Sequence, residues 1–315
     1  MTSPDLALRA AGSRRVAALA ALPDKGARRW LQLALAAVWL LDAILQLQSF
    51  MFTRGFGQSL AATAAGNPAV VADPINWSAR LIEAHPTWTN AAFASVQLFI
   101  ALGIAWRPTV KAALAASVAW SLGVWWLGEG LGGVLTGTAS PVSGAPGAVI
   151  IYALLAVLLW PVEAEGAFVA ARPLGVRSAR LAWLVLWGSL AYFAVQSANR
   201  TGQGLHGMLA GMTAGEPGWL ASLDRGAASL LAGQGAVTAV VLAVVLAVVA
   251  AGIYGPAPAV RAAVVLAIVV AVVVWVVGEN FGMILAGSAT DPNSGPLLVL
   301  LAIAYWPLSA IEKRS

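Results

Sequence analysis

Two acidic residues stand in matching sequence contexts 150 residues apart, at Glu129 and Glu279. Each lies in the pattern Trp-x-x-Gly-Glu-x-x-Gly-x-x-Leu-x-Gly-x-Ala, which begins at Trp125 in the first copy and at Trp275 in the second. A carboxylate at the edge of a bilayer or inside it is costly, so its presence in both copies indicates proton, cation or polar-ligand handling. The structural alternative is a carboxylate that accepts backbone N–H bonds and holds a re-entrant loop.

Four glutamines supply amide side chains in the same two halves of the sequence as the two acidic motifs. Gln48 near the outer end of the first apolar segment matches Gln196 in the fifth, and Gln97 in the second matches Gln234 in the sixth. We expect two amides and one carboxylate to lie together in the outer third of each half. Amides also hydrogen-bond across transmembrane helices, contributing about 0.6–2 kcal/mol, and this is the structural alternative.

Asp42 breaks the symmetry between the two halves. It lies near the middle of the first apolar segment, with Gln46 one turn away on the same helical face. The aligned positions of the second half are Leu190 and Ala194. The first half is therefore the better candidate for a deep polar pocket, although a protonated Asp42 bonded to Gln46 or to a nearby carbonyl would be a purely structural feature.

The segment that follows the second motif holds two further polar candidates, Asp291 and Asn293. It is rich in turn-forming residues and precedes the last apolar run, where Asp and Asn commonly cap a helix. The segment that we align with it in the first half, residues 140–146, has neither residue.

The composition predicts an integral membrane protein. Of the residues, 60% are hydrophobic and 10% charged, and the mean hydropathy is +0.83, whereas soluble domains carry about 25% charge. The excess of 18 Lys and Arg over 13 Asp and Glu lies mostly beside apolar runs, so it reports membrane topology and not nucleic-acid binding.

Several cofactors and catalytic classes are disfavoured by the residue types present. The chain has no cysteine, which excludes disulfides, thiolate metal sites and Fe–S clusters within it. The two histidines, His85 and His206, fall in predicted outer loops, where they would not ligate a haem inside the helices. The sequence holds no nucleotide-binding, zinc-protease or Ser-His-Asp signature, so it does not establish an enzyme.

Eight apolar segments are long enough to cross a bilayer as helices. They lie near residues 31–50, 90–106, 109–127, 146–162, 181–199, 228–252, 259–277 and 295–309. This assignment puts 14 of the 18 Lys and Arg on one side and 4 on the other, which predicts cytoplasmic termini in a bacterial plasma membrane.

The predicted fold class is therefore all-α, with two parallel-repeat units of four transmembrane helices. Residues 30–162 form the first unit and 181–309 the second. A basic leader (1–29), a linker (163–180) and a tail (310–315) lie in the cytoplasm. Each unit has a long outer loop, at 51–89 and 200–227, in which we expect amphipathic surface helices.

A four-span unit with a long outer segment after its first helix, and with Trp39-Leu-Leu-Asp42 in that helix, resembles the DoxX-like group of bacterial membrane proteins. The resemblance covers both units, so the chain looks like a fused pair. It implies a role in quinone-linked sulfur oxidation or in a membrane oxidative-stress complex, with quinone as the ligand and a membrane or periplasmic protein as partner. The Gly-Glu motif is not part of the resemblance.

Three classes of function stay open on the sequence. The first is a quinone-linked redox or respiratory accessory subunit. The second is a transporter or permeation protein for a proton, a cation or a small polar solute. The third is a structural or assembly protein without turnover.

Overall fold

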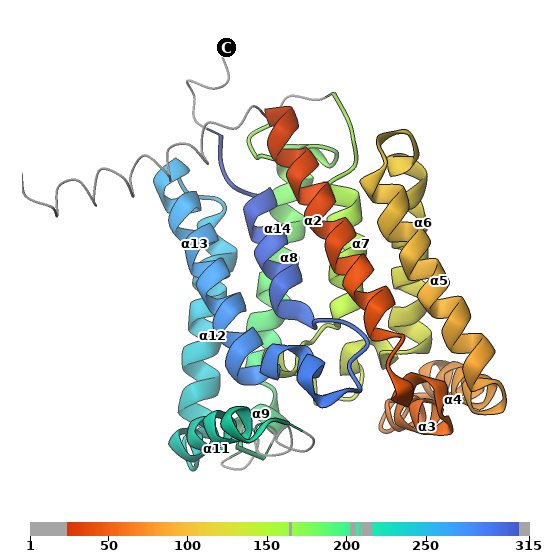
Figure 1. The fold of residues 1–315 in the computed structure, drawn as a ribbon. Coiled ribbons are helices and arrows are strands. Elements are labelled where there is room, and N and C mark those ends of the chain that lie inside the picture. Colours follow the sequence, from red (N-terminus) through yellow and green to blue (C-terminus); the bar gives the residue numbers. More distant parts are fainter. Residues whose placement is uncertain (1–23, 164–165, 202–205, 208, 210–215, 309–315) are drawn as a thin grey trace, which may run out of the picture.

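The computed structural model describes residues 24–163, 166–201, 206–207, 209 and 216–308, and these fold as an all-helical protein (Figure 1). The β-structure in that part is limited to an isolated bridge between Phe168 and Pro307. The predicted leader (1–29) falls outside it except for residues 24–29, which already belong to the first long helix. The predicted tail (310–315) lies outside the described residues.

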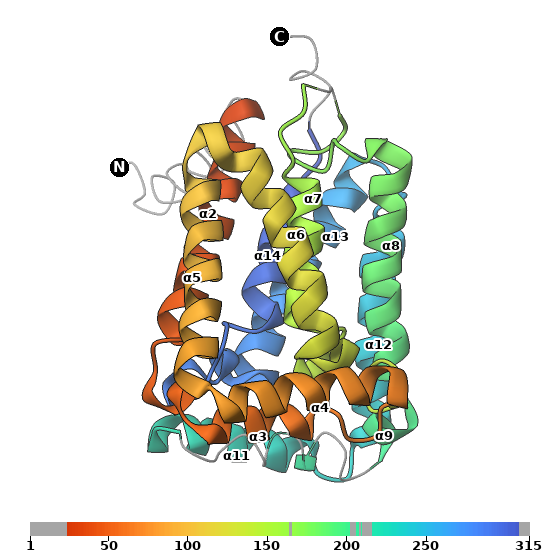
Figure 2. The same cartoon turned by 90° about the vertical axis from the view of Figure 1, so that its right-hand side faces the viewer.

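The long helices stand side by side and run between the two ends of the molecule (Figures 1 and 2). They are α2 (Asp24–Leu45), α5 (Pro86–Ala105), α6 (Val110–Leu127), α7 (Ala148–Leu158), α8 (Gly175–Ala194), α12 (Gly235–Gly252), α13 (Ala257–Val273) and α14 (Ser294–Ala304).

Shorter helices lie across one end of these upright helices, opposite the start of α2 (Figure 2). They are α3 (Arg54–Ala62), α4 (Ala69–Ala84), α9 (Ser197–Arg200) and α11 (Gly218–Leu231), with the 3₁₀ turn η1 (Ser49–Phe52) leading into α3. We call this the crosswise end. Helices α3 and α4 lie within the first long loop in which the sequence predicts surface helices, and α11 begins within the second, whereas most of α9 falls in the predicted fifth span.

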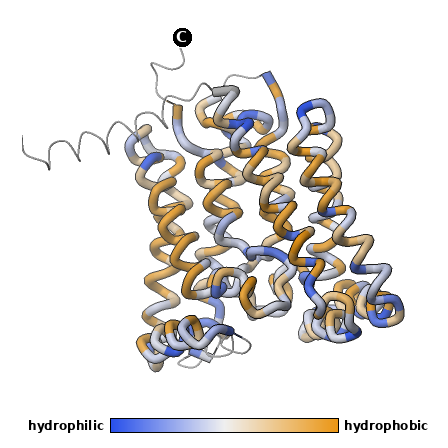
Figure 3. Tube along the Cα trace, viewed as in Figure 1, coloured by the Kyte–Doolittle hydropathy of each residue, from blue (hydrophilic) through white to orange (hydrophobic). Residues whose placement is uncertain are grey.

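Among the residues that the structure describes, four helical segments are long and apolar enough to cross a membrane, and they indicate a membrane protein. They are Pro86–Ala105, Arg107–Leu127, Gly235–Gly252 and Ala257–Ala286. Hydrophobic residues cover the upright helices along their length, while polar residues gather at the ends (Figure 3). Such helices lack a polar face because lipid surrounds them on the outside.

Several helices depart from the predicted spans. Helices α7 and α14 have 11 residues each, about 16 Å of helix, against a hydrocarbon layer of about 30 Å. Helix α12 begins at Gly235 and not near residue 228, because Gly233 at φ +76° separates it from α11. Residues 228–231 therefore belong to a crosswise helix.

The upright helices pack in neighbouring pairs. Helix α2 lies against α5, α6 against α7, α8 against α12, and α13 against α14, while α7 and α14 contact each other between the two sets. Large buried rings fill the interior, including Trp39 against Tyr152 at 4.4 Å between ring centroids and Trp183 against Tyr305 at 4.9 Å. These ring contacts fix α2 to α7 and α8 to the residue that follows α14.

Two irregular segments follow α6 and α13 at the crosswise end, and they carry the two Gly-Glu motifs. After α6 comes the 3₁₀ turn η3 (Gly130–Gly133); after α13 come the π-helical turn η5 (Val274–Gly278) and the 3₁₀ segment η6 (Asn280–Ala286). Both contain residues with positive φ, such as Leu131 at 56° and Phe281 at 54°. Such backbone is costly for residues with a side chain and marks positions that the surrounding contacts impose.

Candidate functional site

The first motif lies at the end of α6, and the Glu129 carboxylate in it reaches the start of α7. The Glu129 N–H donates to the Val124 carbonyl at 3.0 Å, which closes the helix, and Trp125 Nε1 donates to the Pro146 carbonyl at 2.7 Å. Glu129 Oε1 then accepts from the Val149 N–H at 3.3 Å, at the N-terminus of α7. Its other oxygen, Oε2, is shielded from solvent and has no hydrogen-bond partner of good geometry among the described residues, although the backbone of Ala148 also interacts with this carboxylate.

The second motif repeats these backbone contacts but holds its carboxylate differently. Trp275 Nε1 donates to the Pro292 carbonyl at 2.9 Å. Glu279 is 1% exposed, and both of its oxygens have donors: Oε1 accepts from the Ser294 hydroxyl, and Oε2 from the Gly295 N–H at 2.9 Å. This carboxylate therefore binds the first turn of α14, where backbone donors and the helix dipole favour a negative charge.

The two connecting loops differ in length. Trp125 reaches a carbonyl 21 residues ahead, whereas Trp275 reaches one 17 residues ahead. By these contacts Pro146 corresponds to Pro292, so Ala148 corresponds to Ser294. The alignment of residues 140–146 with 290–296 was therefore wrong by four positions, and Ala148 has no hydroxyl to offer Glu129.

Close packing requires glycine at the same place in both irregular segments. A Cβ on Gly132 would lie 2.0 Å from the Pro146 carbonyl oxygen, and one on Gly282 would lie 2.5 Å from that of Pro292. Both glycines also have positive φ, at 62° and 70°. The glycines of the motif thus let each segment fold back against its proline-containing loop.

Asp42 lies inside the helical bundle and is 2% exposed. Its Oδ2 accepts from the hydroxyl of Tyr152 on α7 at 2.5 Å, and its Oδ1 has no hydrogen-bond partner in the described ranges. The partner is therefore Tyr152 and not Gln46, which contacts Asp42 only through the helical backbone bond. Tyr152 is also within electrostatic range of Asp291 and, more weakly, of Glu129.

Asp291 and Asn293 build the loop before α14. Asp291 accepts from the Thr290 hydroxyl at 2.7 Å and from the Asn293 N–H at 2.8 Å, and Asn293 Oδ1 accepts from the Ser294 N–H at 2.7 Å. Burial raises the pKa of Asp291, and the first two hydrogen bonds act against this rise. Asp291 also acts electrostatically on Glu129 across the boundary between the two halves. The predicted capping role is confirmed for Asn293.

The four glutamines do not form two equivalent sets. Gln97 on α5 is 8% exposed, and its Oε1 has no partner. Gln234, by contrast, is exposed and precedes α12, because that helix starts later than predicted. The expected common depth of Gln97 and Gln234 was therefore wrong.

Gln48 follows α2, and Gln196 follows α8. At or near each of them, a side-chain amide donates a hydrogen bond to a carbonyl in the other half of the chain. Gln48 Nε2 donates to the Ala289 carbonyl at 3.3 Å. In the second half it is Asn199, three residues after Gln196, that donates to the Ala139 carbonyl, at 3.0 Å. Ala139 and Ala289 are the last residues of the two motifs. Gln196 itself keeps a shielded Oε1 without a partner.

Sequence reasoning missed several buried polar residues near Asp42. Asn90 Nδ2 donates to the Gln46 carbonyl at 2.6 Å, and Trp39 Nε1 donates to the Ser117 hydroxyl at 3.1 Å. Ser121 on α6 is also buried, and its hydroxyl lacks a partner. A hydroxyl or amide inside an apolar run was the available signal for these residues and for Tyr152, since such groups need a partner when buried.

Crosswise helices cover both motifs. Ser78 on α4 donates to the Leu127 carbonyl at 2.8 Å, and Thr63 donates to that of Gly128 at 3.0 Å. Over the second motif, Asn280 Nδ2 donates to Asp224 Oδ2 on α11 at 2.7 Å. Burial raises the pKa of Asp224, and the neighbouring Glu216 acts against this rise.

Within the described residues, no group of three or more His, Asp or Glu side chains is arranged to hold a metal ion. The site therefore consists of carboxylates, amides and hydroxyls inside an apolar helical protein. No protein-family model, curated protein or solved structure matches this chain.

Proposed function

We propose that the protein binds and conducts protons or small cations through the first of two four-helix units, at Asp42 and Glu129. The observation that supports this most is that Asp42 Oδ1 and Glu129 Oε2 are shielded from solvent and have no hydrogen-bond donor within the part of the chain that the structure describes. A buried carboxylate oxygen without a donor is costly, and a proton or a cation removes that cost. A carboxylate kept in an apolar bundle at such a cost is a candidate site for ion handling.

The surroundings of Asp42 favour a positively charged species over an anion. Gln46 lies one turn after Asp42, and Asn90 donates to the Gln46 carbonyl. Gln97 and Ser121 lie elsewhere on α5 and α6. A shielded side-chain oxygen of each of these four residues has no partner among the described residues. Oxygen acceptors suit a hard cation or a protonated group, whereas an anion would need donors. Tyr152 donates to Asp42 and is within electrostatic range of Glu129, and its hydroxyl can both accept and donate, as a proton relay needs.

The proposal includes eight membrane crossings, parallel four-helix units and cytoplasmic termini in a bacterial plasma membrane. The matched Trp–Pro hydrogen bonds and the matched Gly packing of the two irregular segments support a duplicated origin. The distribution of Lys and Arg supports the orientation.

Flux measurements test the function. In liposomes that hold the purified protein and a pH-sensitive dye, an imposed membrane potential should drive proton entry above that of protein-free liposomes. Asp42→Asn and Glu129→Gln should each lower this flux at least tenfold, because an amide cannot take up a proton in the same way. Asp73→Asn is the control, because Asp73 is exposed on α4, and this variant should conduct like the unchanged protein.

A parallel experiment with Na⁺ or K⁺ gradients and cation-sensitive dyes distinguishes a cation from a proton. If neither proton nor cation flux exceeds that of protein-free liposomes, the proposal fails. If flux persists in both variants, the two carboxylates do not carry it.

A quinone-linked accessory subunit is the second candidate, and it also gains some support from the donor-free oxygens. A quinol has two O–H groups, and Asp42 Oδ1 and Glu129 Oε2 are acceptors for such donors. Organic extraction of the purified protein, followed by mass spectrometry, should then recover a quinone in near-stoichiometric amount. Its loss in Asp42→Asn would favour this candidate over ion conduction.

The proposed topology can be mapped without background labelling, because the chain has no cysteine. Arg177→Cys should react with a membrane-impermeant thiol reagent only after the cells are opened. Arg80→Cys on the crosswise end should react in intact spheroplasts. The reverse pattern would contradict the orientation.

A further inference from the structure

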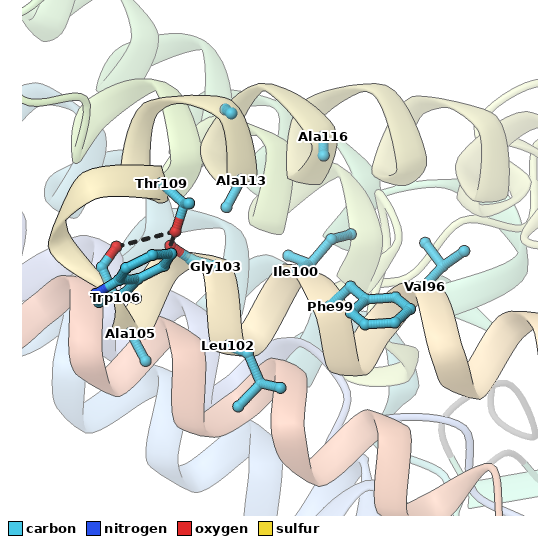
Figure 4. A pocket seen from close by; sticks show the side chains of 11 residues that line it. Val96, Phe99, Ile100, Leu102, Gly103, Ala105, Trp106, Thr109, Ala113 and Ala116 are labelled. Carbon is cyan, nitrogen blue, oxygen red and sulfur yellow. Dashed lines mark hydrogen bonds between the residues drawn. The ribbon is translucent and has the colours of Figure 1, made fainter.

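An open groove runs between α5 and α6, at the end of the molecule opposite the crosswise helices (Figure 4). Its volume is about 790 Å³. Val96, Phe99 and Leu102 line it from α5, Ala112 and Ala116 line it from α6, and Trp106 closes it at the turn η2 (Arg107–Thr109). The groove lies apart from Asp42 and Glu129.

The lining of the groove suits a hydrocarbon chain. Gly103 lets α5 approach α6, since a Cβ there would lie 2.7 Å from that of Ala113. The Thr109 hydroxyl already donates to the Gly103 carbonyl at 2.8 Å. It therefore offers no free donor to a polar ligand, and the other lining side chains are apolar except at Trp106.

Cationic side chains surround the turn that closes the groove. Arg107 lies between the lining residues Trp106 and Thr109, and Lys111 follows two residues later; both are exposed. Arg29 reaches the same turn from α2, where its guanidinium donates to the carbonyls of Ile104, at 2.9 Å, and Ala105. Burial and then the charge of Arg107 lower the pKa of Arg29, which shows that the two guanidinium groups repel each other.

Within the part of the chain that the structure describes, Arg107 and Lys111 have no acidic partner. An anion placed beside them would relieve the repulsion between Arg29 and Arg107. Exposed Trp106 has the character of a residue at the membrane–water interface, where lipid phosphates lie.

We propose that the groove binds one anionic phospholipid, with an acyl chain between α5 and α6 and its phosphate against Arg107 and Lys111. The combination of an apolar channel with a basic end matches the two parts of such a lipid. The proposal concerns a lipid site and does not depend on ion conduction through Asp42.

Native mass spectrometry of the detergent-purified protein tests the head-group contact. Phosphatidylglycerol should bind more tightly than phosphatidylcholine with the same acyl chains. Each of Arg107→Ala and Lys111→Ala should weaken phosphatidylglycerol binding about fivefold, while the exchange Arg107→Lys should restore most of it. Arg80→Ala, on α4 at the other end, is the matched control and should bind like the unchanged protein.

A second pair of variants tests the acyl-chain contact. Ala116→Phe fills the groove and should weaken binding of both lipids, whereas Ala115→Phe, on an exposed part of α6 outside the groove, should not. Inorganic phosphate at millimolar concentration should not replace the lipid, because it lacks the acyl chain.

Three results would overturn the proposal. One is equal binding of the two lipids that does not change in Arg107→Ala and Lys111→Ala. Another is binding of phosphatidylglycerol that Ala116→Phe leaves unaltered. The third is a dimer that Ala116→Phe dissociates, which would make the groove a contact between two copies of the chain.

Discussion

After α6, Glu129 accepts one long hydrogen bond and keeps one oxygen without a donor; after α13, Glu279 has a donor on each oxygen. The two carboxylates share the same motif, the same helix-closing backbone bond and the same Trp–Pro contact. The difference comes from the loops that follow, which place Ala148 in one half where the other has Ser294. A shared motif can therefore hold a satisfied structural carboxylate in one copy and an unsatisfied one in the other.

The largest expected difference between the two regions is in stability. Glu279→Ala leaves the Ser294 hydroxyl and the Gly295 N–H unpaired in a buried place, which should cost about 2–4 kcal/mol. Glu129→Ala removes one long hydrogen bond and an oxygen that has no donor, so it should cost less than about 1 kcal/mol. Chemical unfolding in detergent measures both; equal losses would remove the proposed distinction between the two carboxylates.

Placing a hydroxyl at position 148, or removing the one at Ser294, should make Glu129 and Glu279 behave more like each other. Ala148→Ser offers Glu129 a donor where Ser294 serves Glu279, so it should raise stability by about 1 kcal/mol and lower ion flux. Ser294→Ala should lower stability by about 1–3 kcal/mol, because it removes a donor from a buried carboxylate. Unfolding and flux measured on the same preparations provide the check. An Ala148→Ser protein with unchanged flux would contradict the role given to Glu129.

The two contacts that cross between the halves should differ in strength. Asn199 is 2% exposed and donates to two carbonyls, those of Ala139 and Phe193, at 3.0 and 2.8 Å. Gln48 is half-buried and donates once, at 3.3 Å. Asn199→Ala should therefore cost about 2 kcal/mol and Gln48→Ala about 0.5 kcal/mol, as thermal unfolding would show. A larger loss in Gln48→Ala would reverse this ranking.

The smallest expected difference is in the pH dependence of the crosswise helices. A buried carboxyl with a raised pKa favours folding at low pH, so the α11 contact through Asp224 should strengthen as pH falls from 7 toward its ordinary pKa of 3.8. Hydrogen exchange of α11 should accordingly slow as the pH is lowered from 7 to 4, after correction for the intrinsic rate. Asp224→Asn should reduce this change, and Asp224→Asn combined with Glu216→Gln should abolish it, because the pKa of Glu216 is raised as well.

The matched contact over the first motif involves hydroxyls and carbonyls only. Ser78→Ala should loosen α4 by the same amount at both pH values. A pH-dependent effect of Ser78→Ala would mean that some other group governs the titration.

The sequence predicts the all-helical class and the apolar helices well, because a long apolar run has few alternatives. It also places Asp42 inside the helical bundle, since Asp42 lies within such a run. The hydrogen-bond partner of Asp42 could not be predicted in the same way. Tyr152 lies 110 residues away in the sequence, and no periodic pattern of residues connects the two.

The loops and turns at the helix ends explain the remaining errors, which concern the alignment of the two halves and the start of α12. Four additional residues in the first loop shift the match between the halves, so Ala148 and Ser294 correspond only after the Trp–Pro contacts are known. Gly233 similarly delays the start of α12 and leaves Gln234 exposed. Composition locates an apolar helix, but the turn chemistry at its ends decides which residues it contains.

The hydrogen bond between Gln48 and the Ala289 carbonyl also has a consequence for biosynthesis, because its two ends are 241 residues apart. At translation rates of about 5–20 residues per second, the Gln48 amide waits on the order of tens of seconds for the carbonyl that it will bind. During that interval the chain after α2 lacks this contact. The end of α2 can therefore join the second motif only after most of the protein has been synthesised.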